Sequence, residues 1–388
     1  MSGDWSSGVC SSDLPSLRMG AGLAGELGQI TRPICGDRVL LVTDPGMMAT
    51  GLVQQATDCL RAAGVEVTLF DQVQADPPEE IVLQAAQQAR GKTGVIGFGG
   101  GSSLDVAKLA ALLAASNQPL AEAYGIGNAQ GPRLPLVLVP TTAGTGSEVT
   151  PISIVTTGAS EKMGVVSPLL LPDLALLDPE LTLGLPAHVT AATGIDAMVH
   201  AIEAYASVNA NNNPISRALA VEALGLMGRM LLRAVQKPDD LEARTGMLLG
   251  SMLAGQAFAN SPVAAVHALA YPIGGHYKVP HGLSNALVLP HVLRFNAQVA
   301  PEAYAELLPH VFPDLPAMNV AEAAMKFAQG MADLSQACGL EQGLREMGIA
   351  REVLPKLARD AMNQTRLLVN NPRPVDEAAA MQIYEAAW

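Results

Sequence analysis

Between residues 38 and 186, short apolar runs alternate with longer amphipathic segments. The apolar runs, rich in valine, leucine and isoleucine, predict β-strands at 39–43, 65–70, 93–98 and 134–139. The segments between them repeat their apolar positions at helical spacing, which predicts helices at 52–63, 80–90 and 103–116. Strands and helices that alternate in this way are typical of a parallel sheet with helices on both faces.

The pattern changes after residue 186. Residues 188–388 are rich in alanine, leucine and methionine with helical periodicity, and loops interrupt them at 209–214, 312–316 and 370–374. We therefore expect an α/β domain at residues 15–187 and an all-helical domain at residues 188–388. Residues 1–14 are Ser-rich, aperiodic and unlike a signal peptide, and we interpret them as a foreign or artefactual tail.

Composition excludes several classes of protein. The chain has 388 residues, of which 49% are hydrophobic and 15% charged, so it has ample material for two cores and is not disordered. The net charge of −13 leaves no basic stripe for nucleic acid, and no apolar run is long enough to cross a bilayer. The four cysteines lie far apart without a CxxC pair, which favours a reducing cytoplasm over a disulfide framework.

Asp196 and His200 are the first candidate metal ligands. They lie four residues apart in segment 193–204, which we predict to begin a helix, so both side chains share one face. A carboxylate beside an imidazole is half of a divalent-metal site, although an isolated pair is more often an ordinary Asp–His contact. His267 and His281, each in an apolar Gly/Pro-rich setting, complete a plausible set of four ligands.

A glycine-rich segment follows the third predicted strand and opens a helix. Free N–H groups at a helix N-terminus favour an anion, and glycines let a phosphate approach the backbone closely. The residues concerned are Gly99, Gly100, Gly101 and Ser102. Ser102 and Asp105 also have the spacing of a capping box. A tight strand-to-helix loop without a ligand explains such a segment equally well.

Two further segments follow strands. The hydroxyl- and glycine-rich residues 140–148 come after the fourth strand, where they either line a cofactor cleft or form a solvated turn. Asp44 ends the first strand, where an acid accepts hydrogen bonds from ribose hydroxyls and repels a 2′-phosphate. A plain Asp-Pro-Gly turn is the simpler explanation of Asp44 taken alone.

In this order, the motifs resemble those of the iron-containing (group III) alcohol dehydrogenases. The matching segments are GGGSSLDVAK (99–108), PTTAGTGSEVT (140–150), TGIDAMVHAIEAY (193–205), HALAYPIGGHYKVPHGLSNALVLP (267–290) and NPRP (371–374). The resemblance covers nearly the whole chain after residue 20. It implies the dehydroquinate synthase-like fold, in which a dinucleotide-binding α/β domain precedes a helical domain and the active site lies in the cleft between them.

The resemblance also implies roles for individual residues. The ligands of Fe(II), with Zn(II) as the alternative, would be Asp196, His200, His267 and His281. The NAD contacts would come from Asp44, from Gly99, Gly100, Gly101 and Ser102 with Asp105 beside them, from Thr141 and Thr142 along the nicotinamide, and from Lys162 at a ribose.

Two departures from the family pattern stand out. Tyr271 occupies the position where many members have a proton-relay histidine, so we expect Tyr271, His276 (in a Gly-rich turn), a water or the ribose hydroxyls to carry the proton. Members usually begin with a short strand before a glycine turn. Here Gly20 and Gly22 remain, and we expect the tail to have replaced the strand that helps some relatives to dimerise.

The resulting expectation is a metal-dependent oxidoreductase. It would transfer a hydride between a primary or secondary alcohol, or a hydroxyacid, and NAD(H), as a homodimer or higher homo-oligomer without nucleic-acid or membrane partners. The alternatives are a hydroxyacid–oxoacid transhydrogenase that retains its nucleotide, a metal-independent reductase of the maleylacetate type, and a catalytically silent metal- or nucleotide-binding protein.

Overall fold

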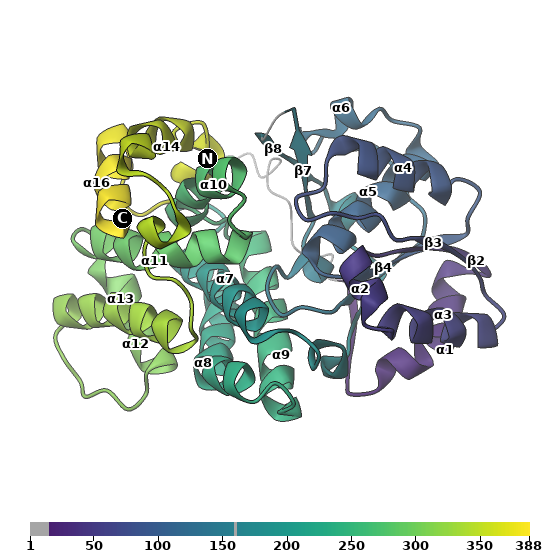
Figure 1. Ribbon diagram of the computed structural model, residues 1–388, viewed down its shortest axis with the longest axis horizontal. Helices are drawn as coiled ribbons and strands as arrows, with labels where there is room; N and C mark the ends of the chain where they lie inside the picture. Colours follow the sequence, from purple (N-terminus) through teal and green to yellow (C-terminus); the bar gives the residue numbers. More distant parts are fainter. Residues whose placement is uncertain (1–14, 159–160) are drawn as a thin grey trace, which may run out of the picture. The chain divides into compact units, whose positions relative to one another are not determined.

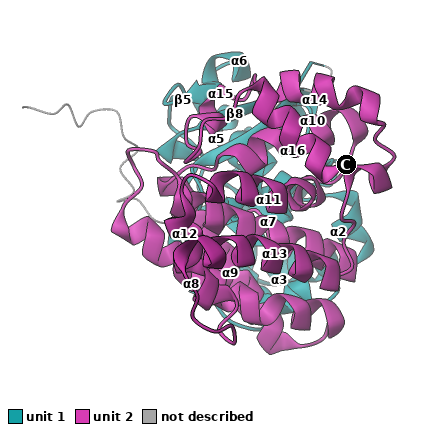
Figure 2. Cartoon of the chain, turned by 90° about the vertical axis from the view of Figure 1, so that its left-hand side faces the viewer, with its two compact units in different colours: residues 1–142, 146–184 teal, residues 143–145, 185–388 magenta. Residues whose placement is uncertain are grey.

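The computed structural model describes residues 15–158 and 161–388, so the predicted tail lies outside the described residues. Contacts between residues divide the chain into two compact units (Figure 2). The first comprises Met1–Thr142 and Gly146–Gly184, and the second comprises Ala143–Thr145 and Leu185–Trp388. Residues 143–145 therefore belong to the second unit, although they are surrounded in sequence by the first.

The first unit is built on a six-stranded sheet in the order β1-β9-β6-β4-β2-β3, and every neighbouring pair is parallel (Figure 1). The strands are β1 (Ser16–Met19), β2 (Arg38–Val42), β3 (Glu66–Phe70), β4 (Gly94–Gly99), β6 (Leu136–Pro140) and β9 (Leu174–Leu177). The strand β1 pairs with β9 along its whole length. The expectation that the tail has replaced this strand is therefore wrong, because β1 lies within residues 16–19.

Helices cover both faces of this sheet. The helices of this unit are α1 (Leu27–Cys35), α2 (Pro45–Ala49), α3 (Leu52–Ala62), α4 (Glu79–Ala89), α5 (Gly101–Ser116) and α6 (Leu120–Ala123). Val39 and Leu41 of β2 pack with α1 and α3, whereas Leu40 and Val42 pack with α4 and α5. Side chains alternate between the faces of a strand, so an unbroken apolar run is what a strand covered on both sides requires.

A second, three-stranded sheet was not predicted. Its order is β5-β8-β7, and its strands are β5 (Gly125–Ile126), β7 (Ile152–Thr157) and β8 (Glu161–Val166). The strands β7 and β8 pair antiparallel. Their positions are mostly half-buried, which is why this region lacks the continuous apolar runs of the main sheet.

The second unit consists of helices and the loops between them over its described length. Its helices are α7 (Ala187–Ala206), α8 (Pro214–Gln236), α9 (Leu241–Asn260), α10 (Ala265–Tyr277), α11 (His281–Ala297), α12 (Pro301–Val311), α13 (Val320–Ala337), α14 (Leu354–Ala361), α15 (Thr365–Leu368) and α16 (Glu377–Ala387). The prediction that a helix begins at residue 193 is wrong, because α7 already begins at Ala187. Thr193 lies inside α7 and donates to the Val189 carbonyl.

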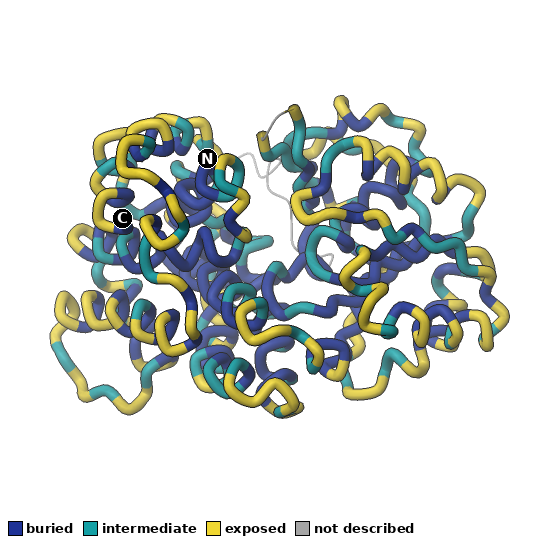
Figure 3. Tube along the Cα trace, viewed as in Figure 1, coloured by how far each residue is buried: buried dark blue, intermediate teal, exposed yellow. Residues whose placement is uncertain are grey.

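Burial marks the centre of each unit. The inner strands β2, β4 and β6, the strand β9 and most of α7 are buried apart from Arg38 at the start of β2, and exposed positions gather on the outer helices and loops (Figure 3). Residues 194–206 of α7 are all buried, although they include Asp196, His200 and Glu203. Two buried carboxylates and a buried imidazole on one helix require specific partners. Across the described ranges, no helix combines the length and the apolar character that crossing a membrane would need.

Candidate metal centre and candidate nucleotide-binding edge

Three of the predicted metal ligands lie together in the second unit. The α7 residues Asp196 and His200 face the α10 residue His267, and one ligand atom from each lies within 4.8 Å of the others. All three side chains are buried. The helical spacing of Asp196 and His200 thus produces the shared face that the sequence suggested, and α10 supplies the third side chain.

His281 joins this cluster from its more accessible side. It is the first residue of α11, and its Nε2 lies 3.7 Å from Asp196 Oδ1. The centroids of the His281 and His267 rings are 5.4 Å apart. The His281 side chain is 37% exposed, whereas that of Asp196 is 3% exposed. The four predicted residues therefore converge, with three at the back of the cluster and His281 nearest to solvent.

The donor set fits a divalent cation. Among the described residues, His267 Nε2 and His200 Nδ1 are buried and have no hydrogen-bond partner. Leaving a buried polar atom unsatisfied costs about 1–3 kcal/mol, so two such atoms beside a buried carboxylate indicate a ligand that they share. One carboxylate and three imidazoles suit Fe(II) or Zn(II).

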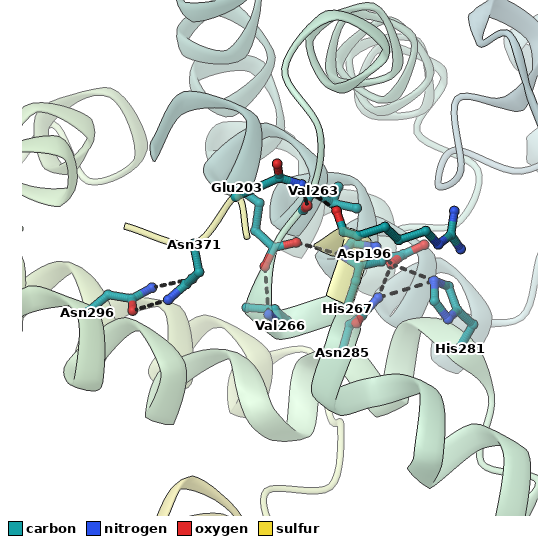
Figure 4. A network of polar contacts seen from close by, with 11 residues as sticks. Asp196, Glu203, Val263, Val266, His267, His281, Asn285, Asn296 and Asn371 are labelled. Atoms are coloured by element: carbon teal, nitrogen blue, oxygen red, sulfur yellow. Dashed lines mark hydrogen bonds and ion pairs between the residues drawn. The ribbon is translucent and has the colours of Figure 1, made fainter. Parts of the chain in front are cut away.

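Two residues that sequence reasoning missed hold these side chains in place. Glu203 accepts a hydrogen bond from Val266 N at 2.6 Å, and its other oxygen lies 2.7 Å from His267 Nδ1 (Figure 4). With Nδ1 donating to Glu203, His267 Nε2 keeps its lone pair for a cation. Asn285 donates to Asp196 Oδ1 at 2.6 Å and lies 3.3 Å from His281 Nε2.

A local signal for both residues was present. Glu203 follows His200 by three positions, and Asn285 follows His281 by four, so each lies on the same helical face as a predicted ligand.

The electrostatics keep Asp196 ionised and His200 neutral, which are the forms that bind metal, but they favour the protonated form of His267. Burial lowers the pKa of His200 to about 3, so its ring is neutral near pH 7. Burial alone would raise the pKa of Asp196, but the three neighbouring imidazoles outweigh it and lower the pKa. Burial opposes protonation of His267 as well, yet the hydrogen bond and charge of Glu203 raise its pKa.

Residues 143–145 pack against α7 within the same unit. A Cβ on Gly144 would lie only 2.8 Å from Thr193 Cβ, so this close approach requires glycine. A backbone hydrogen bond also joins Gly144 to His200. The hydroxyl-rich loop therefore supports the ligand-bearing helix, a role that its sequence did not suggest.

The two candidate proton-relay residues have different surroundings. The Tyr271 ring centroid lies 5.8 Å from that of His281, beside the cluster. His276 lies in the last turn of α10 rather than in a Gly-rich turn, so that prediction is wrong. Its Nε2 is 2.7 Å from Asp360 Oδ2 and 2.7 Å from Lys356 Nζ, two groups of α14.

In the first unit, the glycine-rich loop joins β4 to α5. Gly99 has a φ of 153°, and a Cβ there would lie 2.9 Å from Ser103 Cβ. Gly100 is the N-cap of α5, and no side chain caps that position. The N–H groups of the first turn have no partner within the helix, which makes this terminus suitable for an anion.

The predicted capping box is wrong. Ser102 lies within the first turn of α5, and the Asp105 carboxylate points to other partners. It accepts hydrogen bonds from Ser147 Oγ at 2.6 Å and from Ile154 N at 2.9 Å. Asp105 thus fixes the segment that follows β6 rather than the start of its own helix.

Lys108, a buried residue that the sequence analysis did not single out, strengthens the connection between α5 and the segment after β6. Lys108 Nζ donates to Ser147 Oγ at 2.8 Å and to the Ile152 carbonyl at 2.7 Å, and it lies 3.6 Å from Asp105 Oδ1. Burial lowers the pKa of Lys108 and raises the pKa of Asp105. Burial also raises the pKa of the neighbouring Glu148 to about 7.

Asp44 lies beside the glycine-rich loop. Its Oδ1 accepts from Met47 N at 3.0 Å as the N-cap of α2, and its Oδ2 accepts from Ser103 Oγ at 3.1 Å. The chain proceeds from β2 to β3 on one side and returns to β4 on the other, so Asp44 and Gly99 meet at the switch point of the sheet. Nucleotides bind at such points in open α/β sheets.

An open cavity of about 460 Å³ lies beside Asp44, and its lining is Pro45, Met48, Asp71, Gln72, Gln74 and Ile81.

The other predicted nucleotide contacts differ in position. Thr141 follows β6 and donates its N–H to the Gly99 carbonyl at 3.0 Å, and Thr142 lies 3.6 Å from where a Cβ on Gly100 would be. Both therefore line the same carboxyl edge as the glycine loop. Lys162 is on β8 of the small sheet, with Nζ 2.5 Å from Asp76 Oδ1.

Comparison with known proteins bears on both units. The family described as iron-containing alcohol dehydrogenase matches residues 15–179, and the C-terminal part of the same family matches residues 190–388. Long-chain-alcohol dehydrogenase 1 of Geobacillus thermodenitrificans (strain NG80-2) is 41% identical over 96% of this chain and 95% of that protein. The 1,3-propanediol dehydrogenase of Klebsiella pneumoniae is 36% identical over 93% and 94%.

A solved structure matches the chain over the same range as these relatives. The crystal structure of a 1,3-propanediol oxidoreductase aligns with a TM-score of 0.91 at 35% identity, covering 97% of this chain and 98% of that one. The matches extend over both units and include every segment that carries a candidate site residue. The chain therefore belongs to the iron-containing alcohol dehydrogenase family of oxidoreductases.

Proposed function

We propose that the protein oxidises primary or secondary alcohols with NAD, and reduces the corresponding aldehydes or ketones, at a divalent-metal centre. The observation that carries this proposal is the convergence of Asp196, His200 and His267, whose ligand atoms lie within 4.8 Å of one another in a buried cluster. The family assignment supports the reaction class. In the reaction, the alcohol gives a hydride to the nucleotide and a proton to solvent.

The metal would be held by Asp196, His200, His267 and His281, with Fe(II) as the first choice and Zn(II) as the alternative. Such a cation supplies a Lewis acid that lowers the pKa of an alcohol hydroxyl. Asp196 contributes the negative charge, and Glu203 and Asn285 fix the orientations of the ligands. His281 lies at the exposed side, where a substrate would enter.

The nucleotide would bind at the carboxyl edge of the main sheet. We assign the pyrophosphate to Gly99, Gly100, Gly101 and Ser102, because the first turn of α5 offers backbone N–H groups there. Asp44 would accept from the adenosine ribose, and Thr141 and Thr142 would line the nicotinamide side. Asp105 would act indirectly, because it holds the segment after β6 through Ser147 and Ile154 and would not contact the nucleotide itself. Lys162 would reach a ribose from β8.

For proton transfer, Tyr271 is the better supported of the two candidates. Its ring lies beside His281, whereas the ring of His276 is engaged by Asp360 and Lys356. We therefore propose that the Tyr271 hydroxyl passes the substrate proton towards solvent.

The substrate would be a small alcohol or aldehyde. Relatives are named for long-chain alcohols and for 1,3-propanediol, so both chain length and a second hydroxyl belong in the test panel. The transhydrogenase and the maleylacetate-type reductase are not favoured, because the named relatives are alcohol and diol dehydrogenases and the ligand set is intact.

We also propose a cytoplasmic homodimer or higher homo-oligomer. The cytoplasmic location is supported by Cys35, Cys59 and Cys338, the cysteines within the described ranges, which form no disulfide.

The test is NADH absorbance during turnover of primary alcohols, secondary alcohols, diols and hydroxyacids with added NAD. We expect steady NADH formation from at least one alcohol, and its loss in His267→Ala protein that still binds NAD. Undiminished turnover by metal-free His267→Ala protein would refute the metal role. Hydride exchange between a hydroxyacid and an oxoacid without net NADH would favour the transhydrogenase.

A further inference from the structure

The NPRP segment near the C-terminus, which the sequence analysis matched to the family, has no role in the reaction described above. Residues 371–374 (NPRP) follow α15, and Asn370 precedes them. Asn370 and Asn371 are 1% and 5% exposed, which is unusual for amides in a loop. A buried amide is tolerated only where its donors and acceptor are satisfied, so its partners show what it holds together.

Asn370 connects the end of α7 to the start of α10. Its Oδ1 accepts from Asn209 Nδ2 at 2.8 Å, and its backbone carbonyl accepts from Val208 N at 2.9 Å, just beyond α7. Its Nδ2 donates to the Val263 carbonyl at 3.0 Å, just before α10. One residue thus bridges the segments that end the helix of Asp196 and begin the helix of His267.

The bond from Glu203 to His267 spans the same two helices. Glu203 lies in the last turn of α7, and it accepts from Val266 N and contacts His267 Nδ1 in the first turn of α10 (Figure 4). These contacts of 2.6 and 2.7 Å require that the two helix ends keep a fixed separation. We propose that Asn370 is a positioning residue for the metal centre, which sets the α7–α10 separation across which Glu203 orients His267. This proposal rests on the metal centre proposed above.

Asn371 provides a matched comparison. It pairs reciprocally with Asn296 of α11, with N–O distances of 3.0 and 2.8 Å. Asn296 is 15 residues beyond His281, or about 22 Å along the helix. Asn371 and Glu203 also line one small internal cavity. Asn371 is therefore also buried and lies near Glu203, but its side chain bonds to Asn296 and to the Arg373 carbonyl and does not join α7 to α10.

The experiment measures Co(II) affinity of the metal-free full-length protein by competition with a chromophoric chelator. The variants are Asn370→Ala and Asn371→Ala, each alone and combined with Glu203→Gln. We expect Asn370→Ala to weaken Co(II) binding about tenfold, the lower end of the range for residues that support metal ligands. It should also shift the visible Co(II) spectrum. Asn371→Ala should stay within about twofold of wild type although it lowers stability in urea.

A double-mutant cycle separates positioning from general destabilisation. In the Glu203→Gln background, Asn370→Ala should weaken binding less than about twofold, since the contact through which it acts is already lost. Equal losses for the two asparagine variants, or fully additive losses with Glu203→Gln, would overturn the proposal.

Two further outcomes, misfolding of Asn370→Ala and failure of the wild-type protein to bind Co(II), also decide the proposal. If Asn370→Ala does not fold, Asn209→Ala removes one of the bonds of Asn370 from the partly exposed α7 side, and it should weaken Co(II) binding in the same direction. An unchanged affinity of Asn209→Ala would then overturn the role of Asn370. Failure of the wild-type protein to bind Co(II) would overturn the metal centre and this proposal together, whereas wild-type binding without an Asn370 effect overturns this proposal alone.

Discussion

Replacing Glu203 with glutamine should weaken metal binding without removing a metal ligand. The carboxylate has two acceptors for two buried donors, Val266 N and His267 Nδ1, at 2.6 and 2.7 Å. Glutamine retains one acceptor oxygen, so its NH₂ group must face one of these donors. A lost hydrogen bond to a charged group costs about 1.5–3 kcal/mol. Loss of a partner that supports a metal ligand typically weakens affinity about 10- to 100-fold, which corresponds to about 1.4–2.8 kcal/mol.

The assay is a competition titration of metal-free protein with Co(II) and a chromophoric chelator, run on wild type, Glu203→Gln and Glu222→Gln. Glu222 is an exposed residue of α8, so its variant makes the same chemical change away from the cluster. We expect the weakening only in Glu203→Gln. A Glu203→Gln dissociation constant within twofold of wild type would refute the role that we assign to this carboxylate.

Three further predictions concern the first unit. Gly99→Ala forces a Cβ to within 2.9 Å of Ser103 Cβ. The NAD affinity of this variant, measured by fluorescence titration, should therefore fall about tenfold or more. The control variant Gly25→Ala has nothing within 4 Å of its Cβ and should bind NAD normally. Asp44→Gly should raise the ratio of NADP to NAD efficiency in kcat/KM, and an unchanged ratio would exclude Asp44 as the discriminating acid. Burial raises the pKa of Glu148 from 4.5 to about 7, so the Glu148 carboxyl holds its proton more tightly in the folded protein than in the unfolded chain. The stabilisation from this protonated carboxyl is complete below pH 4.5 and is lost as the pH rises through about 7. The Tm of wild type should therefore fall across this range relative to the Tm of Glu148→Gln. Parallel Tm profiles of the two proteins would contradict this reasoning.

The sequence predicted the parts of the fold that local periodicity encodes. Segment 39–43 was assigned to a strand because both faces of β2 are covered, which makes its residues uniformly apolar. The small sheet was missed because β7 and β8 are half-buried, so their apolar positions are diluted by polar ones. The strand β1 was missed because it has only four residues, three of them exposed, and therefore shows no apolar run.

The candidate site was likewise predictable only in part. Asp196 and His200 share a helical face, so their proximity follows from spacing alone. No local rule brings His267 or His281 to them; their apolar Gly/Pro-rich settings suggested them as further ligands, and the family resemblance implied the same set. The spacing of Glu203 from His200 places both on one helical face, but it does not reveal the bond of Glu203 to His267, 64 residues away. Lys108 could not be assigned because its partner Ser147 is 39 residues away.

The most direct test of the metal centre is elemental analysis of anaerobically purified protein, on wild type and on Asp196→Asn and His267→Ala. We expect about one equivalent of iron or zinc per chain in wild type. Both variants should lose most of that metal while they still fold and bind NAD. Metal-free wild-type protein that turns over alcohols at full rate, or variants that keep their metal, would contradict it.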